Sequence, residues 1–481
     1  MLLGLIFATA PVVASAQQPN VVVLMTDDQT ADSMWAMPWT REQIGAEGVT
    51  FTNSFVSYPR CCPSRASFFT GQYAHNHGVL SNTLPFGSYD RLDTSSWLPL
   101  WLQAAGYRTA HLGKFLNGYG DVNPTEVPPG WDEWHATTGR ETYRYWGYKV
   151  NENGRLETYG SDRDPDLYAT DFMSRRASKL IEDLAPSDAP FFLSVGFLAP
   201  HTGGPAEPGD PPGVATPAVA PRHRGAFAGE PLPRPPGFGE RNVFDKPPRI
   251  KRLPRLSPAR IDLIRQKYRQ RLESLLAVDD GVDGIIDALR QAGELENTLL
   301  IFTSDNGFFH GEHRIWSGKA QVYEPAIRVP LLMRGPGITP GRRPSRIVGN
   351  VDLAPTILEA AGLPPRPELD GRSLLPLARG PVPRWRDNLL LEGGDRLGLD
   401  YDGIRTPRYV YAEHRAGPRE LYDLELDPYQ LRSVHRSPAY AAVRAELEAR
   451  LTNLRICAGA SCRAPAGKLP RPALPTRLPR P

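Results

Sequence analysis

The chain has 481 residues, of which 40% are hydrophobic and 9% aromatic, so it is long and apolar enough for one large domain and a smaller one. Its 56 Lys and Arg residues nearly balance its 53 Asp and Glu residues, which leaves a net charge of +3. A protein that follows a nucleic-acid backbone needs a concentrated basic face, so this balance gives no reason to expect a nucleic-acid partner. The basic excess lies partly in Pro/Arg-rich stretches, which we interpret as solvated loops.

The first 16 residues, MLLGLIFATAPVVASA, form an apolar run that ends in Ala14-Ser15-Ala16. This run is too short to span a bilayer, and its Ala-x-Ala ending fits a signal-peptidase site. We therefore predict that residues 1–16 are a signal peptide and that the protein is periplasmic or secreted, with a buried strand as the alternative. No later apolar run is long enough for a membrane helix, so we expect no stable membrane insertion.

Four continuous apolar runs, 20–26, 191–198, 299–303 and 329–333, are predicted to be strands buried in a mostly parallel sheet. Residues 107–112 are predicted to be extended. Helices are predicted at 98–105 and from Pro258 onwards, where Ser257 provides an N-cap and apolar residues recur every three or four positions. Because strands alternate with helices, the sequence indicates an α/β sandwich, which we place at residues 19–375.

A Pro/Gly-rich stretch at 202–256 cannot hold regular structure for long. We interpret it as a long surface excursion of the large domain, with an interdomain linker as the alternative. After residue 375 the pattern changes to short strands followed by a helix, which predicts a small α+β domain with an antiparallel sheet at 376–464. Its expected elements are strands at 388–392, 408–413 and 420–424 and a helix at 438–454. Residues 465–481 are predicted to be a disordered tail.

Polar residues follow several of these strands, where ligands gather in open α/β sheets. Lys114 and His201 each come soon after one strand. The residues with oxygen ligands are Asp27, Asp28, Asp305 and Asn306. Three carboxylates and an amide carbonyl suit Ca²⁺, or Mg²⁺, better than zinc. Each aspartate taken singly is also compatible with a turn or an N-cap.

The four cysteines fall into two pairs. Cys457 and Cys462, in CAGASC, can form a short-loop disulfide in an oxidising compartment, worth about 2 kcal/mol, with two free thiols as the alternative. Cys61 and Cys62 are adjacent in CCPSRASFFTG. Cys61 alone is compatible with a thiolate nucleophile, a vicinal disulfide or a buried thiol. The pattern Cys61-x-Pro-Ser-Arg65, with Thr-Gly downstream, matches the signature of sulfatases.

On these residues the chain resembles the formylglycine-dependent sulfatases of the alkaline-phosphatase-like superfamily. The closest likeness is to N-acetylglucosamine-6-sulfatases and extracellular heparan endosulfatases. It extends over nearly the whole length, through segments such as PNVVVLMTDDQ, GKFLNGYG, TSDNG, SGKAQVYEPAIRVPLLMRGPGI and CAGASCRAP. The resemblance implies an alkaline-phosphatase-like sandwich with a large, mostly parallel central sheet, followed by the smaller C-terminal domain.

The resemblance also implies a set of site residues. A formylglycine-generating enzyme would convert Cys61 to formylglycine, and Arg65 would steady the formylglycine hydrate. Sulfate and the leaving oxygen would be held by Lys114, His201 and Lys319. A Ca²⁺ ion would be bound by Asp27, Asp28, Asp305, Asn306 and the modified Cys61.

This arrangement is chemically coherent, because the aldehyde hydrates to a geminal diol and the metal lowers the pKa of the hydroxyl that attacks sulfur. Lys319 or His201 would protonate the leaving alcohol, and the second hydroxyl would then expel sulfate. The expected substrate is a sulfated small molecule or glycan resembling N-acetylglucosamine 6-sulfate. Two alternatives are a phosphate or phosphonate ester hydrolase of the same superfamily, and a non-catalytic binder of sulfated glycans if Cys61 stays unmodified.

One position departs from the family pattern, because Leu116 stands where many arylsulfatases have a histidine. Asn117 is a candidate for substrate binding, or for a turn with Gly118. We expect the pairs Asp279-Asp280 and Trp131/Trp134 to be structural, the first on a helix and the second in the core. Four histidines are further candidates for the pocket wall: His75, His77, His310 and His313.

Overall fold

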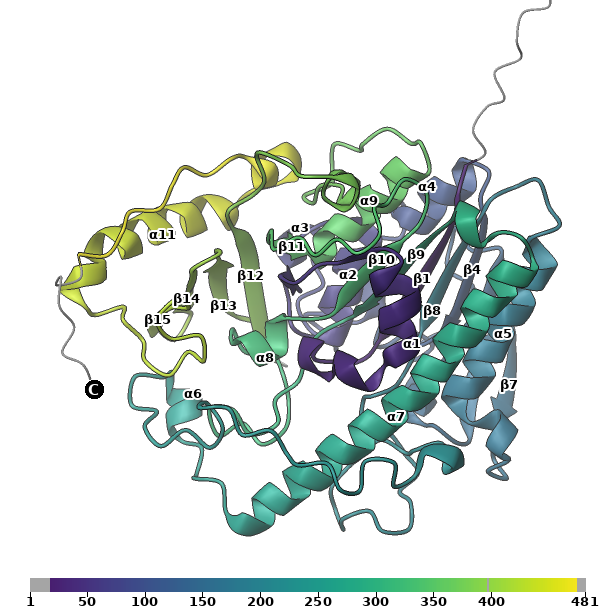
Figure 1. Cartoon of the computed structure of the whole chain (residues 1–481), viewed down its shortest axis with the longest axis horizontal. Coiled ribbons are helices and arrows are strands. Elements are labelled where there is room, and N and C mark those ends of the chain that lie inside the picture. The colour runs from purple at the N-terminus through teal and green to yellow at the C-terminus, as the bar shows by residue number, and fades with distance from the viewer. Residues whose placement is uncertain (1–17, 396–397, 474–481) are drawn as a thin grey trace, which may run out of the picture.

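The computed structural model describes residues 18–395 and 398–473, and its centre is a nine-stranded sheet (Figure 1). In sheet order, the strands are β2 Val49–Thr50, β10 Leu331–Arg334, β9 Thr298–Ser304, β1 Asn20–Thr26, β8 Phe191–Gly196, β4 Arg108–Gly113, β5 Glu133–Thr137, β6 Tyr148–Glu152 and β7 Arg155–Tyr159. The inner strands from β9 to β5 pair in parallel, and each of the two outermost strands at either edge pairs antiparallel with its inner neighbour. The predicted mostly parallel sheet is therefore confirmed.

Alternate residues of the central strands belong to two separate cores. Val21 and Val23 of β1 pack in one apolar cluster, whereas Val22 and Leu24 pack in another. The first cluster lies under α2 Cys61–Thr70, α4 Leu98–Ala104 and α9 Leu353–Ala360, and the second under α5 Ala169–Leu184 and α7 Pro258–Gln291. Because β1 is buried on both faces, it reads as a continuous apolar run, and the domain is a three-layer sandwich.

Helix α7 starts as the sequence predicted, with the Ser257 hydroxyl accepting from the Arg260 N–H at 3.2 Å. The Asp279 carboxylate on this helix accepts from the backbone N–H groups of Trp39 and Thr40 at 3.0 and 2.8 Å. Asp280 pairs with Arg222 at 2.8 Å. Both aspartates therefore have structural partners, as predicted.

The Pro/Gly-rich stretch 202–256 contains only short helices, a 3₁₀ helix at Pro221–His223 and α6 Pro248–Lys251. It runs beside α7, where Phe227 and Leu232 pack with Tyr268 of that helix. The stretch thus leaves the sandwich after β8 and returns to it at the start of α7.

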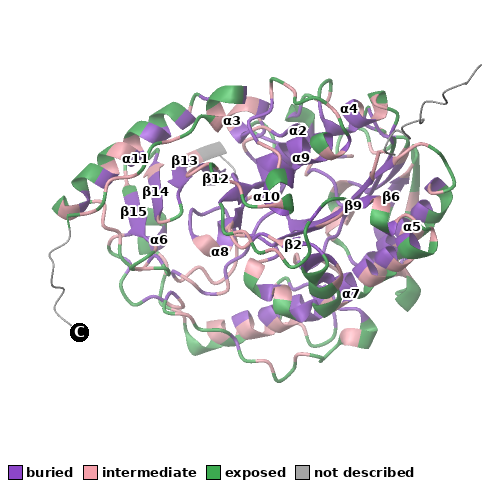
Figure 2. Ribbon diagram, turned by 45° about the horizontal axis from the view of Figure 1, so that its top comes forward, coloured by how far each residue is buried: buried purple, intermediate pink, exposed green. Residues whose placement is uncertain are grey.

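The C-terminal region forms a four-stranded antiparallel sheet, as predicted, with helix α11 Ala441–Leu454 packed on it. Its strands are β12 Leu389–Asp395, β13 Gly398–Arg405, β14 Tyr409–His414 and β15 Arg419–Asp423. Phe55 and Tyr73 of the large domain belong to the same buried cluster. Figure 2 shows strands β14 and β15 largely in purple, the colour of buried residues. Cys457 and Cys462 form the expected disulfide. The domain boundaries themselves remain predictions, and the signal peptide and residues 474–481 lie outside the described part.

Strands β5, β6, β7 and β13 and helix α5 were not predicted from the sequence. The edge strand β7 is mostly exposed and therefore lacks an apolar run. Trp131 and Trp134 are 5% and 0% exposed, which confirms that they belong to the core rather than to a sugar-stacking surface. Among the described residues, no helix has the length and apolar character needed to cross a membrane.

His75, on α3 Ala74–His77, links the two domains. Its Nδ1 lies 3.0 Å from Glu392 Oε1 of β12, and its Nε2 lies 2.9 Å from the Cys457 carbonyl oxygen. Burial lowers the pKa of His75, but the hydrogen bond and charge of Glu392 outweigh burial and raise this pKa to about 9.

We expect the stability of the protein to fall in alkali through this contact. The pKa of His75 is higher in the folded state than in the unfolded state. Its contribution to the free energy of unfolding is therefore fully present below about pH 6.5 and is lost as the pH rises through about 9. Between about pH 6 and about pH 10, the free energy of unfolding should fall by about 2–3 kcal/mol more in the unaltered protein than in His75→Gln. Urea unfolding measures this difference, and parallel pH curves would contradict the prediction.

Candidate active site

Cys61 is the first residue of helix α2, and its preceding residue, Arg60, is extended. The helix ends at Gly71, whose φ of +68° suits glycine, and a Cβ there would lie 2.5 Å from Leu369 Cδ2. Every residue of α2 is buried. Because the N-terminal end of a helix carries partial positive charge, it is a favourable neighbour for anionic groups.

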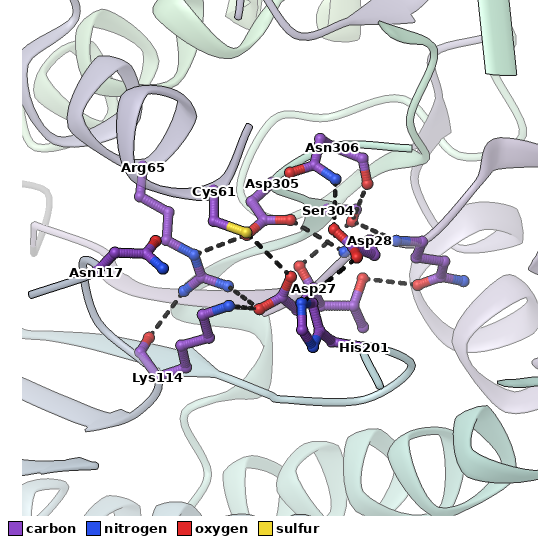
Figure 3. Close-up of polar contacts among 12 residues, drawn as sticks. Asp27, Asp28, Cys61, Arg65, Lys114, Asn117, His201, Ser304, Asp305 and Asn306 are labelled. Atoms are coloured by element: carbon purple, nitrogen blue, oxygen red, sulfur yellow. Dashed lines mark hydrogen bonds and ion pairs between the residues drawn. The ribbon is translucent and has the colours of Figure 1, made fainter. Parts of the chain in front are cut away.

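The predicted oxygen ligands meet at the ends of two paired strands. Asp27 and Asp28 follow β1, and Asp305 and Asn306 follow β9, which is paired with β1 in parallel register. All four residues are at most 2% exposed. The Asp28 N–H donates to Asp305 Oδ1 at 3.0 Å, and Asn306 Nδ2 donates to Asp28 Oδ1 at 2.6 Å (Figure 3).

Three cationic side chains from three other segments reach these carboxylates. Arg65 Nε donates to Asp305 Oδ2 at 2.8 Å, from the first turns of α2. Lys114, just after β4, forms an ion pair with Asp27 (Figure 3). Lys319 forms an ion pair with Asp28, and its Nζ lies 2.8 Å from Cys61 Sγ. Three carboxylates are thus matched by three cations around the cysteine.

His201 completes the group from the segment after β8. Its Nε2 lies 3.7 Å from Asp28 Oδ2, and its Nδ1 lies 2.6 Å from the Thr202 carbonyl oxygen. Because a carbonyl can only accept, Nδ1 carries the hydrogen and Nε2 is free to face the carboxylates. Burial lowers the pKa of His201 to about 3, so the ring is neutral.

The thiols are not activated. Burial raises the pKa of Cys61 to about 12, although Lys319 acts in the opposite direction. Both Cys61 and Cys62 are free and buried, so the vicinal disulfide considered from the sequence is wrong. A buried, protonated Cys61 also disfavours attack by an unmodified thiolate.

The donor set fits a hard divalent cation. Asn306 Oδ1 is buried and has no hydrogen-bond partner among the described residues, although its amide nitrogen is bonded. Ligand atoms of Asp27, Asp28, Cys61 and His201 lie within 4.8 Å of one another. Carboxylate and amide oxygens gathered in this way could hold Ca²⁺ or Mg²⁺.

Arg271 of α7 was not predicted, although it also reaches the site. Its guanidinium donates to the carbonyl oxygens of Asp28 and of Pro200, the latter at 2.8 Å. It thereby joins the segment after β1 to the segment before His201. A signal existed in the sequence, because position 271 lies on the apolar stripe of α7 with Tyr268, where a charged residue is unexpected.

Tyr143 was also missed. Its ring lies 5.0 Å from the His201 ring and 4.7 Å from Lys114 Nζ, and its hydroxyl contacts the side chain of Asn117. The Asn117 carbonyl oxygen accepts from the Tyr89 N–H at 2.7 Å. Asn117 therefore both shapes its turn and supports Tyr143. Nothing in the aromatic-rich segment around Tyr143 distinguishes this residue from its neighbours.

Three of the four further histidines have polar partners elsewhere, whereas the buried Nε2 of His310 has no hydrogen-bond partner among the described residues. His75 contacts the C-terminal domain, and His77 Nε2 lies 3.0 Å from the Ser67 hydroxyl. His313 Nδ1 lies 2.7 Å from Glu240 Oε2, and the His310 ring packs edge-on against Tyr268.

Comparisons with known proteins agree with this geometry. A family model described as Sulfatase matches residues 19–363, and one described as N-sulphoglucosamine sulphohydrolase, C-terminal, matches residues 311–456. The chain is 32% identical to N-acetylglucosamine-6-sulfatase of Homo sapiens, over 97% of this chain and 89% of the human protein. It is 36% identical to an extracellular sulfatase Sulf-1 homolog of Caenorhabditis elegans, over 78% of this chain but only 53% of that relative's length.

Solved structures share the whole architecture. A protein in complex with its substrate, D-glucosamine-2-N,6-O-disulfate, superposes with a TM-score of 0.75 at 25% identity, over 90% of this chain and 97% of the other. Phosphonate monoester hydrolase of Agrobacterium radiobacter superposes with a TM-score of 0.70 at 25% identity, over 91% and 95%. The predicted alkaline-phosphatase-like fold is confirmed. Because the Sulfatase model matches more than two thirds of the residues, the chain belongs to the sulfatase family of sulfate-ester hydrolases.

Proposed function

We propose that this sulfatase acts on sulfated sugars related to glucosamine 6-sulfate, with a formylglycine made from Cys61 and a divalent cation, Ca²⁺ in preference to Mg²⁺. The convergence of three carboxylates and three cations on Cys61 carries this proposal. Two comparisons support the sugar: one relative is named N-acetylglucosamine-6-sulfatase, and one solved neighbour binds a glucosamine disulfate. A relative named as extracellular supports secretion.

The cation would be held by Asp27, Asp28, Asp305 and Asn306 beside the modified Cys61. The formylglycine would supply a hydrated aldehyde, in which one hydroxyl attacks sulfur and the other later expels sulfate. The cation would supply a positive charge that lowers the pKa of the attacking hydroxyl. The same cation would compete with Lys114 and Lys319 for carboxylate oxygens, which leaves both ammonium groups to face an anionic substrate.

Conversion of Cys61 must precede folding. The residue is 1% exposed, and the whole of α2 is buried, so an oxidising enzyme cannot reach the thiol in the folded chain. We therefore infer that a formylglycine-generating enzyme acts on the unfolded polypeptide.

The leaving oxygen needs a proton, and Lys319 is better placed than His201 to give it. The Lys319 ammonium lies 2.8 Å from Cys61 Sγ, where the nucleophile stands. The hydrogen on His201 Nδ1 is already donated to the Thr202 carbonyl, so its Nε2 can only accept. We assign Lys114 to positioning the sulfuryl group, Lys319 to the leaving oxygen, and the Nε2 atom of His201 to accepting a hydrogen bond from the substrate.

Arg65 and Arg271 position the ligand residues. Arg65 donates to Asp305 and, through Nη1, to the Lys114 carbonyl oxygen at 2.8 Å, which fixes two strand ends relative to α2. Arg271 supports Asp28, whose φ of +67° is uncommon for a residue other than glycine. We infer that both arginines act through other residues: Arg65 steadies the modified Cys61 by fixing its surroundings.

A mass measurement tests the nucleophile. Trypsin should release the peptide from Cys61 to Arg65, since arginines precede and end it. In protein made by cells that mature sulfatases, we expect this peptide to carry one aldehyde in place of a thiol. Two intact thiols, in a host that converts a control sulfatase, would contradict the proposal and favour a non-catalytic binder of sulfated glycans.

The structural likeness to a phosphonate monoester hydrolase supports one second candidate, a phosphate or phosphonate esterase. Aryl sulfate, phosphate and phosphonate esters with one leaving group separate the two functions. The proposal requires the sulfate ester to have the highest kcat/KM.

Lys319→Ala should lower kcat on a sulfate ester by about 10²- to 10³-fold, because it removes a preorganised positive charge beside the reacting oxygens. Circular dichroism and thermal melting should show that the variant is folded. The matched control is Lys149→Ala, which removes an exposed lysine from β6. An unchanged kcat in Lys319→Ala would remove Lys319 from the mechanism.

Arg271→Lys should lower kcat/KM by about tenfold or more, because a single ammonium cannot bridge the carbonyl oxygens of Asp28 and Pro200 in a fork. Arg265→Lys, on the same helix but paired with Asp262, is the control. Ca²⁺ binding by calorimetry should weaken in Arg271→Lys alone. Equal affinities in the two variants would contradict a positioning role through Asp28.

A further inference from the structure

Residues at the end of the excursion and the start of α7 carry more net positive charge than the whole chain does. Residues 241–260 contain seven Lys or Arg side chains and one carboxylate, Asp245, which gives a net charge of +6 in a chain whose total is +3. The sequence alone did not indicate that these charges share a surface, because a solvated proline-rich loop need not hold its side chains in a fixed arrangement. The structure shows that the segment is folded.

The segment has an apolar side and a basic side. Val243 and Ile250 are 5% and 1% exposed and belong to the buried cluster of the C-terminal domain. The basic residues on the other side are exposed: Arg241, Lys251, Arg252 and Arg255. Helix α6 within this segment lies at the lower left of Figure 1, below strands β14 and β15.

Arg314 holds the two arms of the segment together. Its guanidinium donates to the carbonyl oxygens of Arg241 at 2.7 Å and of Leu253 at 3.1 Å, while Nε donates to that of Glu240 at 2.8 Å. Because one guanidinium joins both arms, Arg241 is close to the basic group that follows α6. Arg241 thus lies near the stretch that holds Lys251, Arg252 and Arg255, and we call these four exposed residues the basic surface.

The basic surface is attached to the loop that carries the catalytic lysine. Gly239 N–H donates to the Gly311 carbonyl oxygen at 2.9 Å, and His313 N–H donates to that of Gly237 at 2.8 Å. Lys319 comes five positions after Arg314, and an extended chain of five residue steps spans at most about 17 Å. A few linked sugars can cover such a distance.

We propose that the basic surface, formed by Arg241, Lys251, Arg252 and Arg255, docks the polyanionic chain of a sulfated polysaccharide while one of its sugars occupies the sulfatase site. This inference rests on the proposed function, because it names the substrate as a polymer rather than a free monosaccharide. Arginine and lysine pair with sulfate groups, and exposed charges attract a polyanion over about 10 Å at 0.1 M salt. A nucleic acid is the competing polyanion, but a site for sulfate esters beside the surface favours a sulfated glycan.

The test compares two triple variants that each remove three positive charges. One is Lys251→Gln/Arg252→Gln/Arg255→Gln on the basic surface. The control is Arg108→Gln/Lys149→Gln/Arg155→Gln, at exposed positions on β4, β6 and β7. Binding is measured as the salt concentration that elutes each protein from immobilised heparin. Turnover is measured as kcat/KM on heparin chains and on glucosamine 6-sulfate, at low and at high ionic strength.

We expect the basic-surface variant to elute at lower salt than the control and to lose about five- to tenfold in kcat/KM on heparin chains at low ionic strength. Its turnover of glucosamine 6-sulfate should match that of the control, and the difference on heparin should shrink at high salt. Equal elution and equal heparin turnover in the two variants would overturn the proposal. So would a loss of binding to a DNA duplex without any loss on heparin.

Heparin binding does not depend on conversion of Cys61, so it separates this inference from the proposed function. If neither sugar substrate is turned over by the unaltered protein, the proposed function fails, and the elution difference still decides whether the basic surface binds a sulfated chain.

Discussion

Three carboxylates are buried at the ends of two paired strands, and the surrounding structure has to supply a positive charge for each of them. An unpaired charge in such a place costs several kcal/mol, so each aspartate needs a positive partner held in position. Those partners come from α2, from the turn after β4 and from the loop that ends at Lys319. Because these segments are far apart in the chain, the site exists only when the whole sandwich has assembled.

Helix α7 both covers the sheet and supports the backbone that carries these carboxylates. Its apolar stripe covers one face of the sheet, and Arg271 extends from that stripe to the backbone between β1 and His201. Helix α2 approaches from the other face and brings Cys61 to the same point. The two helical layers therefore position Cys61 and the backbone beside Asp28 from opposite sides of one sheet, at the edge where parallel strands direct their ends.

Much of this was predictable from the sequence, for physical reasons. Strands β1 and β9 are buried on both faces and gave continuous apolar runs, and the polar residues that follow them are the ones that meet. Strand β7 is exposed and α2 begins inside a motif, so neither had a periodic signal. Tyr143 reaches the site through a tertiary contact that no spacing reveals, whereas the only sequence signal for Arg271 is a charge on the apolar stripe of α7. The roles of Cys61, Arg65, Lys114, His201 and Lys319 remain predictions, because proximity does not establish chemistry.

The contact between Arg314 and the excursion divides that long segment into parts that tolerate insertions differently. Residues 237–241 and Leu253 are tied to the loop that presents Lys319, so insertions there would displace the lysine. Residues 211–215 have no helix or strand of their own and are exposed or half-buried, so this part can change length without that penalty. The outer surface of the protein can therefore vary there while the position of Lys319 stays fixed.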